Sequence, residues 1–220
     1  MSQDEFTLAL NHPCTVQVVG MTNSGKTTLV SRMIKERETL FSEKIQTVIY
    51  VYKLDQPLLQ ELRNYDKTII FTQDISEALG FVKGKSLMIL DDQLTTISGE
   101  QNQLVNDLFT VGSHHLSCSL ILISQALFGR NLRLISINTV YLIILKSPRD
   151  KASIINLGKQ FCPNQAKYIS EAYRLSNAAP YSHIFFDFSQ QFPEKFRVRS
   201  SVFYDQNLEF YVQSDENCEG

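Results

Sequence analysis

The sequence predicts an α/β fold built on a mostly parallel, doubly wound sheet with helices on both faces. Short apolar runs rich in Val, Ile, Leu and Tyr alternate with helical stretches. Several runs are nearly continuous, as expected of strands buried on both faces of a parallel sheet. The alternation of strands and helices favours βαβ units. The expected strands are residues 14–19, 47–52, 68–71, 86–90, 119–124 and 141–145, and the expected helices are residues 27–38, 58–64, 101–109 and 151–161.

The chain after Pro163 follows a different pattern. A helix is expected at residues 165–175, followed by strands at residues 183–188 and 197–204. The whole length of 220 residues fits one α/β domain. We therefore expect the late strands to be extra edge elements of the same sheet.

Composition excludes several classes of protein. Hydrophobic residues make up 43% of the chain and charged residues 20%, which is enough for a full core and argues against wholesale disorder. The net charge of -2 excludes a broad basic face, so any contact with nucleic acid must be local. The four cysteines show no CxxC spacing and are expected to be reduced thiols. No signal peptide or membrane span is expected.

The segment Gly20-Met21-Thr22-Asn23-Ser24-Gly25-Lys26-Thr27 matches the phosphate-loop pattern G-x-x-x-x-G-K-[ST]. In this pattern the backbone N–H groups face the phosphates, the lysine approaches the β- and γ-phosphates, and the hydroxyl binds Mg²⁺. A β-rich run precedes the motif and an amphipathic helix follows, which is the context that the pattern requires. The residues expected to bind ATP are Gly20, Met21, Thr22, Asn23, Ser24, Gly25, Lys26, Thr27 and Thr28.

This motif makes the predicted fold a P-loop NTPase fold. We expect an ATPase domain at residues 13–205, between an N-terminal segment at residues 1–12 and a polar C-terminal tail at residues 206–220.

Two carboxylates follow the apolar run at residues 87–90. In P-loop enzymes an Asp at the end of such a strand holds Mg²⁺, and Asp91 is predicted to take that role together with Thr27. Asp92 is then placed to orient or deprotonate the attacking water. The structural alternative is a helix N-cap, a position where Asp is also favoured.

A second apolar run ends in polar groups at Gln125. A Gln at that strand tip is expected to face the γ-phosphate, because ligands bind at the carboxyl edge of such sheets. In that position Gln125 could report hydrolysis of the γ-phosphate to the rest of the chain. The alternative is a solvated strand end.

The chain resembles the genome-packaging ATPases of the FtsK/HerA superfamily, and in particular the poxvirus-like packaging ATPases of large DNA viruses, virophages and Polinton/Maverick elements. Many ATPases share the Walker motifs, and the block from His114 to Asp150 is what points to this family in particular. The segments that carry it are residues 18–28, 89–92, 112–125, 135–138 and 141–150, with Asp187 and residues 197–199.

The resemblance implies an ATP- and Mg²⁺-dependent motor, a homo-oligomeric ring that pumps double-stranded DNA into a preformed capsid. Its partners would be the DNA and the capsid or portal vertex proteins. Its location would be the host cell, cytoplasm or nucleus, and the virion. One position departs from the wider superfamily, where Glu is common and this chain has the shorter Asp92.

Ring ATPases complete each site with an arginine from the neighbouring subunit. The candidates are Arg130 and Arg133, which follow the strand of Gln125, and Arg149, which follows the next strand. We favour Arg133. Each of the three could instead be a solvated surface residue.

Two other functions compete with the packaging motor. A small-molecule kinase would carry an Arg-rich lid and a GTPase an N-K-x-D motif, and the sequence contains neither. A nucleotide-dependent assembly protein with negligible turnover would keep Lys26 and Asp91 but lack a working base or finger. ATPase assays with and without duplex DNA separate these possibilities.

Overall fold

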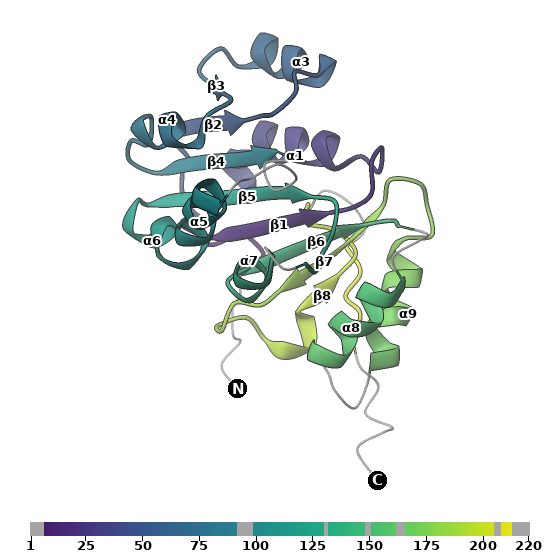
Figure 1. Ribbon diagram of the computed structural model, residues 1–220. Helices are drawn as coiled ribbons and strands as arrows, with labels where there is room; N and C mark the ends of the chain where they lie inside the picture. The colour runs from purple at the N-terminus through teal and green to yellow at the C-terminus, as the bar shows by residue number, and fades with distance from the viewer. Residues whose placement is uncertain are drawn as a thin grey trace.

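The computed structural model describes residues 7–91, 99–129, 132–147, 151–161, 166–204 and 208–212. An eight-stranded sheet runs through this part of the chain in the order β3-β2-β4-β5-β1-β6-β7-β8 (Figure 1). The pairs from β3 to β6 are parallel, and β7 and β8 are added antiparallel at one edge. The strands are β1 (Thr15–Val19), β2 (Thr47–Val51), β3 (Ile70–Thr72), β4 (Ser86–Asp91), β5 (Cys118–Ser124), β6 (Tyr141–Leu145), β7 (His183–Asp187) and β8 (Val198–Arg199).

This architecture confirms the predicted α/β P-loop class, including the extra edge strands. The helices are α1 (Lys26–Lys35), α2 (Arg37–Leu40), α3 (Pro57–Tyr65), α4 (Ile75–Gly80), α5 (Gly99–Asp107), α6 (Ser113–His115), α7 (Arg133–Ile137), α8 (Lys151–Phe161) and α9 (Ala166–Ser176). Three of them, α4, α6 and α7, were not expected because all are very short. The helix expected at residues 27–38 is divided, since α1 ends at Lys35 and α2 follows.

Helices cover both faces of the sheet, as a doubly wound fold requires (Figure 1). The apolar side chains of α1 and α3 pack on one face, against alternate residues of β1 and β5 such as Val18 and Ile121. The opposite face is covered in two parts. Residues from α4, α5 and α7 pack on β4 and β5, whereas α8 and α9 pack on β6 and β7. The central strands are therefore buried on both sides, which explains their continuous apolar sequences.

The segments flanking the expected domain also make contacts with it. Leu10 is fully buried and its N–H bonds to the carbonyl of Leu40. Near the other end, the Tyr211 N–H donates to the carbonyl of Val198 in β8. The division at residues 12 and 205 stays a prediction. No helix within the described residues combines the length and apolar character needed to cross a membrane.

The register of the parallel strands brings three functional segments to one edge. Asp91 at the end of β4 pairs with Ile123 of β5, and Ser124 pairs with Val19 of β1. The carboxyl ends of β4, β5 and β1 are therefore level with one another. In open α/β sheets, ligands bind at this edge.

Candidate functional site

The phosphate loop connects β1 to α1 and is fixed to the neighbouring strand. The Gly20 N–H donates to the Ser124 carbonyl at 3.2 Å. Asn23 (φ 61°) and Gly25 (φ 94°) adopt left-handed backbone conformations, which let the loop curl. A Cβ on Gly20 would lie 2.5 Å from the Ser24 hydroxyl oxygen, so a larger residue there would displace the Ser24 side chain from its place in the loop. The motif thus forms the tight loop that the sequence predicts.

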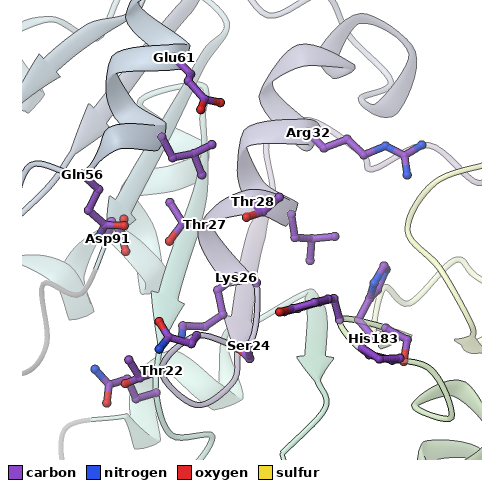
Figure 2. Close-up of a pocket in the computed structure, with 18 of the residues that line it drawn as sticks. Thr22, Ser24, Lys26, Thr27, Thr28, Arg32, Gln56, Glu61, Asp91 and His183 are labelled. Carbon is purple, nitrogen blue, oxygen red and sulfur yellow. The ribbon is translucent and has the colours of Figure 1, made fainter.

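Lys26 lies across this loop from the first turn of α1 (Figure 2). Its ammonium donates to the carbonyl of Gly20 at 2.7 Å and to that of Met21 at 2.8 Å. Residues 22–28 line a pocket directly, whereas Gly20 and Met21 contribute through these two carbonyls. The arrangement holds a positive charge at the point where a bound phosphate chain would lie.

Asp91 is buried at the carboxyl end of β4, with 5% of its surface exposed. The Tyr50 hydroxyl of β2 donates to its Oδ2 atom at 2.8 Å. Burial first, and then the charge of Asp91, raises the pKa of Tyr50 well above its ordinary value. Tyr50 therefore stays a neutral phenol that can donate this bond and orient the carboxylate.

Tyr50 was not identified from the sequence. It stands within the apolar run of β2, where an aromatic residue is ordinarily interpreted as core. The hydroxyl of Tyr50 could have indicated a polar role, because a buried phenol needs a hydrogen-bond partner. The partner belongs to the neighbouring strand in the sheet, so the pairing becomes visible only with the strand order.

Gln125 follows β5 and lines the same pocket as Lys26 and Asp91. The turn that carries it is fixed by the Ser124 hydroxyl, which donates to the Ala126 carbonyl at 3.0 Å. The Gln17 amide of β1 donates to the same hydroxyl at 3.3 Å. Gln125 therefore lies in the pocket beside the phosphate loop, and its role as a sensor of the γ-phosphate stays a prediction.

The pocket has a volume of about 1320 Å³, enough for a nucleotide. It is lined by the phosphate loop, by Asp91 and Gln125, and by residues 180–183 together with Ser200 and Phe203. Asp91 and His183 lie on opposite sides of the loop (Figure 2). Helices α1 and α3 contribute Arg32 and Glu61 to the rim (Figure 2).

The oxygen donors of this pocket suit Mg²⁺. Thr27 offers a hydroxyl and Asp91 a carboxylate, and both line the pocket. Mg²⁺ in nucleotide sites takes only one or two protein ligands and completes its shell with water and phosphate oxygens. Within the described part of the chain there is no cluster of three His, Cys, Asp or Glu residues that would hold a metal without substrate. These two residues therefore fit a nucleotide-bound metal.

The remaining predicted residues are placed as follows. Asp92, Arg130 and Arg149 lie outside the described residues. Arg133 begins α7 and is exposed, and it is not among the described residues that line the pocket. The base role of Asp92 and the trans role of Arg133 therefore stay predictions.

No protein-family model and no curated protein sequence matches the chain. Solved structures do match it. The genome packaging NTPase B204 from Sulfolobus turreted icosahedral virus 2, in complex with sulfate, gives a TM-score of 0.56 at 14% identity, covering 82% of this chain and 94% of that one. Its complex with ATP-gammaS gives 0.53 at 15% identity, with the same coverage.

A second type of neighbour is the type VII secretion ATPase EccC from Thermomonospora curvata. Its cytoplasmic domain gives a TM-score of 0.55 at 14% identity, covering 90% of this chain and 25% of that one. At these identities the likeness establishes the fold. The neighbours are an NTPase and an ATPase, which agrees with the predicted P-loop fold.

Proposed function

We propose that this chain is an ATP-hydrolysing motor that moves double-stranded DNA into a viral capsid. The observation that carries the proposal is the pocket where Lys26 and Thr27 of the phosphate loop meet Asp91 and Gln125 at one sheet edge. The similarity to B204, a genome packaging NTPase, extends over 94% of that chain and supports the packaging role. The ATP-gammaS complex of B204 supports ATP as the nucleotide.

In this proposal the chain's own groups divide the reaction among themselves. Lys26 and the loop N–H groups hold the β- and γ-phosphates, while Thr27 and Asp91 would hold Mg²⁺, which neutralises phosphate charge when bound. The Asp92 carboxylate takes a proton from the attacking water as the water oxygen bonds to the γ-phosphorus. The bond from that phosphorus to the ADP oxygen breaks, and the electron pair leaves with ADP. Gln125 senses the change at the γ-phosphate.

The same proposal includes a homo-oligomeric ring. Arg133 would reach the site of a neighbouring subunit, where an arginine stabilises the transferring phosphoryl group. The partners would be double-stranded DNA and capsid or portal vertex proteins, in the host cell and the virion. With a net charge of -2, one subunit offers little phosphate-binding surface, so DNA affinity should depend on assembly of the ring.

Removal of a labelled third strand from duplex DNA tests translocation directly. The chain, ATP and Mg²⁺ should displace the third strand, and duplex DNA should stimulate ATP hydrolysis. The Lys26→Ala variant, matched in all other respects, should do neither. ATP hydrolysis without stimulation or displacement would overturn the motor and favour another P-loop NTPase. Nucleotide-dependent oligomers with negligible hydrolysis would instead favour the assembly protein.

Mixed rings test whether the site is shared between subunits. Arg133→Ala should leave ATP binding intact and lower hydrolysis by a factor of about 10³ or more, the effect of a trans arginine. Asp92→Asn should also leave ATP binding intact and lower hydrolysis by about 10²- to 10⁴-fold, the contribution of a general base. Mixing the two variants creates some interfaces that carry neither defect, so partial recovery of activity is expected. No recovery at any ratio, in rings shown by mass measurement to be mixed, would contradict a trans role for Arg133.

A further inference from the structure

The pocket has two ends, and only one is explained by phosphate and metal chemistry. Asp91 lies to one side of the phosphate loop and His183 to the other (Figure 2). If the γ-phosphate and Mg²⁺ lie on the Asp91 side, as the proposed function requires, the nucleoside must extend toward the His183 side. The residues on that side are Arg32 of α1, residues 180–183 before and at the start of β7, and Phe203.

Tyr181 is an exposed aromatic residue on this side, with 72% of its surface accessible. Its ring packs on the phosphate loop, because a Cβ on Gly25 would lie 3.2 Å from its Cδ1 atom. Its backbone is left-handed (φ 61°), which is unfavourable for a bulky residue. The ring of Tyr181 is therefore kept at the pocket wall by an unfavourable backbone conformation.

The loop that carries Tyr181 is held on both sides. The Ser182 hydroxyl donates to the Ala179 carbonyl at 2.6 Å. Lys146, just after β6, donates its backbone N–H to the Ser182 carbonyl at 3.3 Å and its ammonium to the Ala178 carbonyl at 3.3 Å. These bonds fix the direction from which Tyr181 enters the pocket.

His183 forms the next part of the wall and is 8% exposed. Its Nε2 accepts the backbone N–H of Val202 at 3.3 Å, so a neutral ring must carry its proton on Nδ1. Burial, and secondarily the charge of Arg32, lowers the pKa of His183 to about 4. The imidazole is therefore neutral at physiological pH and keeps Nδ1–H as a donor.

Arg32 and Phe203 complete this end with a flat stack. The Arg32 guanidinium carbon lies 3.8 Å from the centre of the Phe203 ring. Its Nε donates to Glu36 at 2.7 Å, which fixes the plane of the guanidinium. Phe203 also meets the His183 ring edge-on. Flat groups of this kind are suited to a planar ligand.

From these contacts we infer that Tyr181, His183 and the Arg32–Phe203 pair form the subsite for the base of a purine nucleoside triphosphate. Tyr181 stacks on the base, as aromatic side chains do on nucleobases of any sequence. The Nδ1–H of His183 is the donor for a ring nitrogen of the base, since purine ring nitrogens are acceptors. This inference rests on the proposed function, because it takes the phosphate loop as the site of the triphosphate.

Titration calorimetry of the full chain with two ligands, ATP and inorganic tripolyphosphate, each with Mg²⁺, tests the subsite. Tyr181→Ala should weaken ATP binding about 10- to 100-fold, the range for loss of one base stack. It should leave tripolyphosphate binding unchanged, since no phosphate contact is removed. Tyr181→Phe should bind ATP like the wild type. Tyr65→Ala, which removes another exposed tyrosine away from this pocket, is the matched control.

The other outcomes all have a defined meaning. Wild-type ATP affinity in Tyr181→Ala would overturn the base subsite. An equal loss of ATP and tripolyphosphate would also overturn it, because Tyr181 would then act through the shape of the phosphate loop. If the wild type binds neither ligand, the proposed function fails and the subsite with it. If the wild type binds both equally, the phosphate loop stands and the base subsite alone fails.

Discussion

The two ends of the nucleotide pocket are built in different ways. The phosphate end consists of polar groups at the carboxyl ends of adjacent parallel strands, with Asp91 5% exposed and tied to Tyr50. The base end consists of flat groups on helix α1, at the start of strand β7 and on two loops, with Tyr181 72% exposed. The phosphate end can direct charge at the reacting atoms, whereas the base end can only add affinity. Substitutions at the phosphate end should therefore lower the rate of hydrolysis, whereas substitutions at the base end should weaken ATP binding.

Among the substitutions that compare the two ends, the largest effect is expected at the phosphate end. Lys26→Ala removes the ammonium held by the Gly20 and Met21 carbonyls. The rate of ATP hydrolysis should fall by about 100- to 1,000-fold, the usual loss for one charge-stabilising donor. Tripolyphosphate binding should weaken as well, in contrast to Tyr181→Ala. If Lys26→Ala hydrolyses ATP at the wild-type rate, the phosphate end does not act on the reacting atoms, and the proposed difference between the two ends is wrong.

At the base end, the strongest measurable consequence is a pH dependence of stability. The pKa of His183 is lowered to about 4 in the folded chain, so the unfolded chain binds this proton more readily between pH 6.5 and pH 4. Stability should therefore fall as pH decreases through that window, by roughly 3 kcal/mol for a shift of this size. The difference in unfolding free energy between pH 7 and pH 4.5, measured with urea, should be larger for the wild type than for His183→Gln. Equal pH dependence in both proteins would contradict a buried, neutral His183.

The contrast also explains how much could be predicted from the sequence. The phosphate loop is contiguous, and Asp91 and Gln125 each end an apolar strand, so local patterns place them at one sheet edge. The fold class follows from the same strands. Antiparallel β7 at the edge was expected as an extra element, but the contact of its first residue with the pocket was not.

The base end could not be predicted because its residues meet only in three dimensions. Arg32 and Phe203 come from opposite parts of the chain and stack directly. Tyr181 lies in a loop and His183 begins β7, neither belongs to a motif, and nothing in that segment specifies the left-handed backbone of Tyr181. Their shared position depends on β7 lying next to β6, beside the strand of the phosphate loop.

A smaller effect is expected from the support of Asp91. Tyr50→Phe removes the hydroxyl that donates to Oδ2 and keeps the buried ring. The Mg²⁺ concentration for half-maximal hydrolysis should rise about 10-fold, in the range for loss of an outer-shell partner. Tyr52→Phe, a change of the same kind just after β2, should leave this concentration unchanged. If both variants require the same Mg²⁺ as the wild type, Tyr50 does not position the carboxylate.

The smallest effect separates backbone strain from base recognition at Tyr181. Tyr181→Gly and Tyr181→Ala both remove the ring, so both should bind ATP equally weakly. They differ in the left-handed backbone (φ 61°), which Gly adopts freely and Ala does not. The Gly variant should be more stable than the Ala variant by about 0.5 to 1 kcal/mol, because relief of strain exceeds the larger unfolded-state entropy of Gly. At Tyr65, the last residue of α3, the same pair of substitutions should show the opposite order, because Gly is the poorer helix former. Unfolding in urea measures both pairs. A Gly variant at position 181 that is less stable than the Ala variant would mean that the left-handed conformation depends on the tyrosine ring, and base recognition and backbone strain would then be one property of the loop.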